Sequence, residues 1–467
     1  MTAPARIIVT TDPELDDLNS MLRLLLYSNE IDIAALVYSS SRFHQSGDAD
    51  LDIPAKRWPA AGERLHIDEA IDAYALAYDN LVRHDARYPT PESLRAITAL
   101  GNVIEVGDTR EPTAGSDLVR DVLLGAAPGK VFAQAWGGTN TIARALMSIE
   151  EEYRGTDRWE EIHDLVSRRT VITSFAQQDD TFAEYIRPTW PEIEFRDVAT
   201  MAWGYFAWEV VAPDDQRYLS AEWMRENVSE VGPIGAAYRV WGDGRQMAEG
   251  FDDEDYFGVP DATAEELSAQ GYRLWAPLHP RGSWISEGDT SNFAMHIDNG
   301  LRNAEHPTFG GWGGRQELAG DDPHLWTSVG MRPWAPGEPF ADAGEVAPWF
   351  GAYQRDLAAR LQWSVTPDVS AANHPPRVTA SGLDRVVDAG ERVILEFAVT
   401  DPDGDAVSVR GWQDGGPAAA LSVAATTCTV EVPADAASGA VIRIIVEATD
   451  DGSPVLAGYA RFVLTVR

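Results

Sequence analysis

The sequence RIIVTTDPELDD, residues 6–17, joins an apolar, β-branched run to a dense group of carboxylates. The run RIIVTT has the composition of a buried strand, and LDDLNSMLRLLLYS, residues 15–28, follows with apolar residues at helical spacing. Between them, four acidic residues fall within six positions: Asp12, Glu14, Asp16 and Asp17. We therefore expect these carboxylates at the carboxyl end of a strand, where the chain enters a helix.

The same alternation of strand and helix continues through the first 200 residues. Apolar runs predict further strands at 31–40, 130–136 and 170–175, and helical patterns lie at 67–84, 116–127, 139–153 and 157–169. Strands separated by helices need crossover connections, so the expected fold class is α/β with a mainly parallel, doubly wound sheet. Ligands bind such sheets at the carboxyl ends of the strands.

The remaining chain divides into a loop-rich region and an all-β region. Residues 200–350 are rich in Trp, Gly and Pro and contain only short helical patterns, which is typical of a binding face. After a linker at 365–378, apolar and polar residues alternate between Asp, Gly and Pro turns, which predicts a small immunoglobulin-like β-sandwich. We expect two domains, residues 1–365 with the functional site and residues 375–467 as the sandwich.

The composition and charge indicate which classes of partner the protein can bind and in which cellular compartment we expect it. The chain has 467 residues and a formal net charge of -37, so it lacks the basic surface that nucleic acid requires. Its one cysteine, Cys428, cannot form an intrachain disulfide, and no apolar run reaches membrane-spanning length. The start MTAPARIIVTT has no signal-peptide pattern, so we expect a cytoplasmic protein unless an export signal was removed. The oligomeric state stays open, a homo-oligomer included.

Two interpretations account for the carboxylates of residues 12–17. Asp12 could cap the helix while the others complement the helix dipole, each contributing about 0.3–1 kcal/mol. One cap satisfies the helix end, however, whereas several carboxylates on one turn repel one another. A bound cation removes that conflict, and oxygen ligands favour Ca²⁺ or Mg²⁺.

The segment IIVTTDPELDD resembles the opening of the nucleoside hydrolases, whose strand-end Asp-x-Asp-Pro-Gly-x-Asp-Asp motif holds a calcium ion. Thr10 replaces the first aspartate of that motif and Glu14 replaces its glycine, while Asp12, Pro13, Asp16 and Asp17 match. AQAWGGTN, residues 133–140, follows the family's calcium-binding loop, and SEGDTSNF, residues 286–293, supplies the distant aspartate.

The resemblance implies a calcium site that activates water. The ligands it implies are Asp12, Asp17, the carbonyl of Ala135 and Asp289. Asp12 would also act as the general base that takes the proton of the water, and Asp16 would accept a hydrogen bond from a ring hydroxyl of the sugar.

Further motifs are similar to a subgroup of bacterial proteins described as cellulose-binding, with a nucleoside-hydrolase-like domain and a C-terminal β-sandwich. These motifs are SSSRFH at 39–44, QQDDTFAEYIR at 177–187, SEGDTSNF at 286–293 and FGGWGGR at 309–315. The similarity covers nearly the whole chain and implies a carbohydrate or glycoside partner.

The segment SEGDTSNF departs from the nucleoside hydrolases at the position of a proton donor. Gly288 stands where the family has a histidine, so Glu287 beside it, or Asp179 or Asp180 in the segment QQDD, could serve as the general acid. A carboxylic acid opposite a carboxylate base suits the hydrolysis of an O-glycoside. A furanosyl glycoside is therefore favoured over a nucleoside as the substrate.

Several polar and aromatic side chains are hypothesised to contact the substrate. Arg42 and His44 follow the second strand, and Gln178 and Asp179 lie in the segment where nucleoside hydrolases contact the ribose. Trp136 and Trp312 could stack on sugar rings, because an indole face suits the apolar face of a sugar. For each acidic residue, a hydrogen-bonded loop carboxylate is the competing interpretation, and for each tryptophan a core position.

Three functions are compatible with these patterns. The first is a calcium-dependent glycoside hydrolase that acts on a furanosyl or related glycoside. The second is a carbohydrate-binding protein, specific for cellulose, without turnover, and the third is a true nucleoside N-ribohydrolase. The retained aspartates favour hydrolysis, because binding alone needs no base beside a metal-held water, and the absent histidine favours binding.

Overall fold

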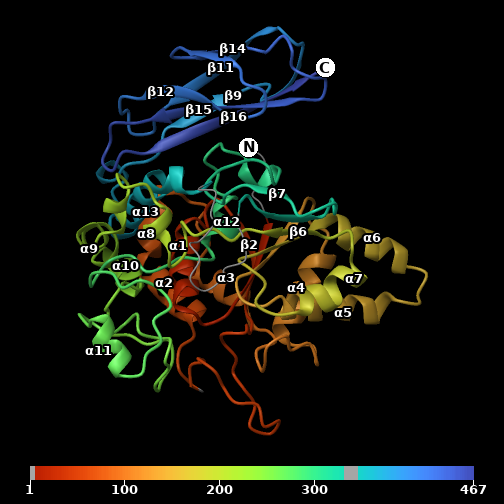
Figure 1. The fold of residues 1–467 in the computed structure, drawn as a ribbon, viewed down its shortest axis with the longest axis vertical. Helices are drawn as coiled ribbons and strands as arrows, with labels where there is room; N and C mark the ends of the chain where they lie inside the picture. Colours follow the sequence, from red (N-terminus) through yellow and green to blue (C-terminus); the bar gives the residue numbers. More distant parts are fainter. Residues whose placement is uncertain (1–5, 61, 331–344) are drawn as a thin grey trace.

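The computed structural model describes residues 6–60, 62–330 and 345–467. Its centre is an eight-stranded sheet in the order β3-β2-β1-β4-β5-β6-β8-β7, in which the pairs from β3 to β8 are parallel and β7 is antiparallel to β8 (Figure 1). The strands are β1 (Arg6–Thr11), β2 (Asp32–Tyr38), β3 (Thr98–Leu100), β4 (Val131–Ala135), β5 (Thr170–Ser174), β6 (Glu194–Asp197), β7 (Gln316–Leu318) and β8 (Leu325–Ser328). The expected α/β class and mainly parallel sheet are confirmed.

Helices cover both faces of this sheet, because side chains of alternate residues in β1 point to opposite faces. Ile7 and Val9 pack into an apolar core with α1, α2 and α13, whereas Ile8 packs into a second core with α4, α5 and α6. The long helices are α1 (Leu15–Leu26), α2 (His66–His84), α4 (Ala114–Leu124), α5 (Asn140–Tyr153), α6 (Trp159–Arg169) and α13 (Phe350–Val365).

The loop-rich region carries only short helices, as its composition predicts. Its short α-helices are α8 (Ala207–Val210), α9 (Ala221–Met224), α10 (Gly232–Ala237), α11 (Ala264–Ala269) and α12 (Thr290–Ala294). Two further short helices, α3 (Pro91–Ala96) and α7 (Arg187–Thr189), precede this region. Many of its aromatic residues are buried against α1, α13 and one another. Among the described residues, no helix combines the length and apolar character needed to cross a membrane.

The C-terminal part consists of two four-stranded sheets that enclose their own apolar core, and this confirms the β-sandwich. Strand β11 alternates buried and exposed residues, as expected for a strand with one face on the core. The strands are β9 (Arg377–Ala380), β10 (Asp384–Val387), β11 (Arg392–Thr400), β12 (Ser408–Gly415), β13 (Ala420–Val423), β14 (Thr427–Glu431), β15 (Val441–Thr449) and β16 (Ala457–Val466).

The sandwich packs on the first domain through a buried ionic cluster. Arg461 is fully buried, donates from Nε to the carbonyl of Leu301 at 2.6 Å and pairs with Asp414. Arg315, from the first domain, donates to the other carboxylate oxygen of Asp414 at 2.8 Å, and Arg443 lies 3.7 Å from Asp414. One carboxylate therefore lies between three guanidinium groups at the junction.

We expect Asp414→Asn to lower the free energy of unfolding by about 3–5 kcal/mol, because it leaves buried guanidinium charge without a partner. Urea unfolding measures this loss. Asp388→Asn is the matched control, because Asp388 forms an exposed pair with Arg467 and such pairs contribute about 0–1 kcal/mol. A loss for Asp414→Asn no larger than that of the control would contradict the role of Asp414.

Candidate functional site

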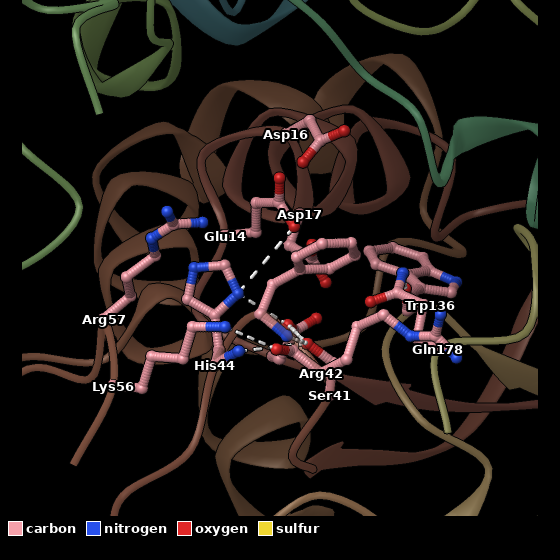
Figure 2. A network of polar contacts seen from close by, with 12 residues as sticks. Glu14, Asp16, Asp17, Ser41, Arg42, His44, Lys56, Arg57, Trp136 and Gln178 are labelled. Atoms are coloured by element: carbon pink, nitrogen blue, oxygen red, sulfur yellow. Dashed lines mark hydrogen bonds and ion pairs between the residues drawn. The ribbon is translucent and has the colours of Figure 1, made fainter. Parts of the chain in front are cut away.

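The acidic residues of the opening motif lie together at the carboxyl end of β1 (Figure 2). Asp12 follows β1 directly, and Asp16 and Asp17 occupy the first turn of α1, a helix whose residues are all buried. Asp289, just before α12, joins them from the loop-rich region. The four side chains belong to residues that are between 0% and 7% exposed, so the charges cannot be screened by bulk water.

Asp12 is held through one carboxylate oxygen only. Its Oδ2 accepts hydrogen bonds from Ser41 Oγ at 2.5 Å and from His44 Nδ1 at 2.8 Å, while Oδ1 has no hydrogen-bond partner among the described residues. Ser41 Oγ in turn accepts from the backbone amides of Phe43 and His44, so the turn after β2 folds around this hydroxyl. The free Oδ1 faces a close backbone approach, because a Cβ on Gly137 would lie 2.7 Å from it.

A second chain of hydrogen bonds holds Asp17. Thr11 Oγ1 donates to Asp17 Oδ1, and His66 Nε2 lies 2.9 Å from Thr11 Oγ1. Since the threonine proton goes to the carboxylate, His66 is the donor to Thr11. Burial lowers the pKa of His66 to about 3, which keeps this imidazole neutral. Asp289 Oδ1, like Asp12 Oδ1, is buried without a partner within the described ranges.

The crowding of these carboxylates perturbs their titration. Burial, followed by the charges of Asp289 and Asp12, raises the pKa of Asp17 well above its ordinary value. Burial and then the charges of Asp16 and Asp12 raise the pKa of Asp289 in the same direction. Burial also raises the pKa of Asp16 to about 6, although a hydrogen bond from Ser286 opposes the shift. A group of negative charges that repel one another in a dry environment is stabilised by a cation.

The donor set of this cluster fits a hard metal ion. One carboxylate oxygen each of Asp12 and Asp289 is buried without a hydrogen-bond partner among the described residues, and the backbone of Gly137 approaches the oxygen of Asp12 closely. Strand β4 pairs Ala135 with Thr10 of β1, so the expected carbonyl ligand lies beside the cluster. Carboxylate and carbonyl oxygens are the ligands of Ca²⁺ and Mg²⁺. The cluster can therefore hold a metal ion.

Asp16 and Glu14 stand at the edge of the cluster. Tyr205 donates to Glu14 Oε1 at 3.2 Å, and Ser286 donates to Asp16 Oδ2 at 3.0 Å. A Cβ on Gly288 would lie 2.6 Å from Asp16 Oδ2. This contact gives a physical reason for the glycine: with Asp16 in this rotamer, a histidine at position 288 has no space.

The residues expected to bind substrate occupy two kinds of environment. Arg42 is exposed and Gln178 is half-buried, and the amide of Arg42 donates to the carbonyl of Gln178 at 2.9 Å, so these two segments meet beside the cluster (Figure 2). Gln178 Nε2 donates to the carbonyl of Trp136 at 2.8 Å. His44, by contrast, is fully buried against Asp12, where it positions the carboxylate and does not face open solvent.

Three other expected contacts lie in structural positions. Asp179 is 2% exposed and accepts from Thr139 Oγ1 and the amide of Asn140, which ties its loop to the start of α5. Trp136 is 0% and Trp312 is 2% exposed, so neither presents an open ring face to a sugar. For these residues, the structure matches the competing interpretations of a loop carboxylate and core tryptophans.

Glu287 lies in a buried ion pair and does not have the environment of a general acid. Arg23 donates to both carboxylate oxygens, at 2.5 Å and 2.9 Å, and Tyr238 and Thr290 also donate to them. Glu287 and Arg23 are 0% and 1% exposed. Both oxygens of this carboxylate are engaged as acceptors, two of the four hydrogen bonds coming from a guanidinium, so neither is free to face a leaving group.

A cavity of about 500 Å³ adjoins the cluster. Glu14 and His66 line it on the side of the acidic residues, and Arg239, Arg245 and Met247 line it elsewhere. The described lining includes no Trp, Tyr or Phe. Glu14 is the acidic residue of the motif through which the buried cluster meets this cavity.

Sequence reasoning missed the residues that orient the carboxylates: Ser41, Thr11, His66, Tyr205 and Ser286. Ser41 lies inside the quoted segment SSSRFH, so its place after a strand was the available signal. His66 and Tyr205 lie 55 and 191 residues from their partners in the motif, and no local pattern points to them.

A further acidic group lies in the sandwich, where Asp401, Asp405 and Asp450 approach one another. Asp401 Oδ1 accepts from the amides of Asp403 and Asp405, and Asp450 Oδ1 accepts from the amides of Gly452 and Leu456. Turn formation thus accounts for Asp401 Oδ1 and Asp450 Oδ1, whereas the buried Asp401 Oδ2 has no hydrogen-bond partner among the described residues.

Comparison with solved structures finds the same fold over nearly the whole chain. The chain is similar to a nucleoside hydrolase-related hypothetical protein from Saccharophagus degradans that is associated with carbohydrate metabolism, with 22% identity, a TM-score of 0.72 and coverage of 99% of this chain and 100% of that one. An endo-fucoidan hydrolase of glycoside hydrolase family 107 (16% identity over 19% of this chain and 13% of that one) gives a TM-score of only 0.15, which supports no argument. Comparison with curated proteins finds no match.

Two family models match the chain. The C-terminal domain of the cellulose-binding protein Sde0182 matches residues 392–466. The nucleoside hydrolase-like domain of cellulose-binding Sde182 matches residues 6–316, which include β1 and every acidic residue of the cluster. The sheet order, the strand-end carboxylates and the sandwich agree with these matches, and the chain belongs to the Sde182 family of nucleoside hydrolase-like, cellulose-binding proteins.

Proposed function

We propose that the acidic cluster is a Ca²⁺ site and that the protein hydrolyses a glycoside there with a metal-activated water. The observation that carries the proposal is the state of Asp12, whose Oδ2 is fixed by two donors while its buried Oδ1 has no partner among the described residues. Most buried side-chain oxygens are hydrogen-bonded, so a buried carboxylate oxygen without a partner needs an explanation. A free carboxylate oxygen amid other carboxylates suits a metal ligand that also receives a proton.

The residues that would hold the ion are Asp12, Asp17, Asp289 and the carbonyl of Ala135. When bound, Ca²⁺ would polarise water and sugar hydroxyl groups. Thr11 and His66 fix Asp17, as Ser41 and His44 fix Asp12, so each carboxylate has an outer partner that sets its orientation. Such outer partners are usual for ligating carboxylates.

The chemical role of Asp12 follows from its partners. Ser41 and His44 both donate to Oδ2, which leaves Oδ1 as the atom that can accept the proton of a water. A positioned carboxylate base contributes roughly 10²–10⁴-fold to the rate of such a step. Asp16 would accept a hydrogen bond from a ring hydroxyl, and its contacts with Ser286 and Tyr205 fix its place beside the cluster.

The adjoining cavity suits a hydroxylated ligand. Its described lining contains the pair of Arg245 and Glu69, 2.6 Å apart, together with Arg239, which pairs with Asp243 outside the lining, and a few apolar side chains. Such charged groups offer donors and acceptors for the hydroxyl groups of a glycoside.

Carbohydrate binding without turnover is the second candidate function. The pairing of Glu287 with Arg23 and the glycine at position 288 remove two sources of a proton for the leaving group. The description of the family as cellulose-binding is in line with this alternative. The variants below separate the two functions.

We expect calcium to raise the free energy of unfolding of the wild-type protein. In Asp17→Asn, calcium should have no such effect. Removal of one buried charge should raise the stability of the metal-free protein, because carboxylate repulsion falls. At a calcium concentration one hundred times Kd, the ion should add about 2.7 kcal/mol to the free energy of unfolding of the wild type. Thermal unfolding with calcium and with EDTA measures both effects.

Asp405→Asn in the sandwich is the matched control for this experiment. It changes one carboxylate of a different acidic group and should keep the full calcium effect. The cluster would be excluded as the calcium site if Asp405→Asn lost the stabilisation and Asp17→Asn kept it.

Asp12→Asn should reduce turnover roughly 10²–10⁴-fold at saturating calcium, because the general base is lost. Since Ser41 and His44 both donate, the asparagine oxygen should take the Oδ2 place and its amide nitrogen the Oδ1 place. Calcium affinity should therefore fall as well, so turnover has to be compared over a calcium titration. Furanosides with a p-nitrophenyl group and nucleosides serve as the first substrates.

Ser41→Ala is the control, because it keeps both carboxylate oxygens and removes a single donor. It should lower turnover less than Asp12→Asn. A wild-type protein that binds a glycoside yet releases no product, with or without calcium, would reject hydrolysis in favour of binding alone.

Glu287→Gln should lower the free energy of unfolding by about 3–5 kcal/mol, because Arg23 then keeps a buried charge without a counterion. Chemical denaturation measures this change, with Glu266→Gln at an exposed helix start as the control. If Glu287→Gln kept wild-type stability and lost turnover, Glu287 would be the general acid after all.

A further inference from the structure

A second cavity, of about 810 Å³, lies between the two domains. Figure 1 shows the sandwich strands β12, β15 and β16 above the part of the first domain that carries α13. Trp349, Ala352 and Arg355 line the cavity from the first domain, and Arg410, Trp412 and Glu447 line it from the sandwich. Its volume lies within the roughly 300–1,000 Å³ of ligand pockets. It shares no lining residue with the acidic cluster or with the cavity beside Glu14.

Aromatic rings form the apolar part of this junction cavity. Trp349 lies 5.8 Å from Trp412 and 5.5 Å from Tyr459 between ring centroids. Trp412 is half-buried, unlike Trp136 and Trp312 at the first site. The Arg410 guanidinium, on an exposed side chain, lies 5.0 Å from the Trp412 ring centroid. An exposed arginine can move aside, so Trp412 can offer a ring to a ligand.

Charged pairs border the aromatic rings. Arg410 donates to Glu447 at 2.9 Å, and Arg355 donates to the hydroxyl of Tyr218 at 2.8 Å. Glu345 and Arg315 form another pair at the rim, 2.8 Å apart. Alternating donors and acceptors beside a flat apolar surface match a ring whose faces are apolar and whose edge carries hydroxyl groups.

The charges argue against other ligand classes. A formal net charge of -37 opposes nucleic acid and other polyanions. A lipid chain would displace water from Glu447, Arg410 and Arg355 and could not replace its hydrogen bonds. A neutral, polyhydroxylated ligand can replace the lost water with its own hydroxyl groups.

We propose that the junction cavity is a binding site for a segment of a neutral carbohydrate chain, separate from the acidic cluster. The sugar stacks on Trp412, and its hydroxyl groups bond to Glu447, Arg410 and Arg355. Both domains contribute to this site, so their packing through Asp414 is a condition for binding. The proposal stands whether or not the acidic cluster hydrolyses anything.

Cellohexaose in calorimetry and amorphous cellulose in a sedimentation assay are the probes, with the full chain throughout. Ala352→Arg places a long side chain in the cavity from the first turn of α13, where Ala352 is half-buried and packs against the apolar core. It should weaken binding at least tenfold, as should Trp412→Ala. Ala96→Arg, at an exposed alanine at the end of α3 outside the cavity lining, is the matched control and should bind as the wild type does.

Urea unfolding of each variant separates lost binding from lost folding, and Trp412→Phe should restore part of the affinity that Trp412→Ala loses. Asp12→Asn should bind both probes as tightly as the wild type, because the site is independent of the acidic cluster. The proposal is overturned if folded Ala352→Arg binds with wild-type affinity, if Asp12→Asn abolishes binding, or if the wild type binds neither probe.

Discussion

Electrostatic repulsion among buried carboxylates is the constraint around which the first domain is built. Asp12, Asp17 and Asp289 meet in a dry environment at the end of β1, where burial raises the pKa of the last two. Neutral donors surround the group, and each fixes one oxygen while others stay free. A protein that placed charges there without a use for them would lose stability. A cation bound among these carboxylates would relieve their repulsion.

The ion pair between Arg23 and Glu287 connects this constraint to the rest of the fold. It anchors the loop before α12 to α1, so that Asp289, two residues after Glu287, is held opposite Asp17. The same contacts that remove Glu287 from proton transfer therefore position Asp289, a ligand of the proposed metal site. At the domain junction, Asp414 has a comparable role, because it pairs with the arginines on which the sandwich is packed.

Local sequence patterns predicted the features that are set by residues close together in the sequence. The strands at 6–11, 31–40, 130–136 and 170–175 and the acidic turn were visible because a parallel sheet buries continuous apolar runs. The short strands β6, β7 and β8 carry too few residues for such a signal. The expected roles of Glu287, Trp136 and Trp312 depended on exposure and on distant partners. Arg23 is 264 residues from Glu287, so only the folded chain reveals the pair.

The most direct test of the account is a crystal structure with calcium, repeated with manganese for its anomalous signal. The account predicts one strong peak bounded by oxygens of Asp12, Asp17, Asp289 and Ala135, with calcium-to-oxygen distances of about 2.3–2.6 Å. An empty cluster at saturating calcium, or a peak only at the Asp401 turn of the sandwich, would contradict it.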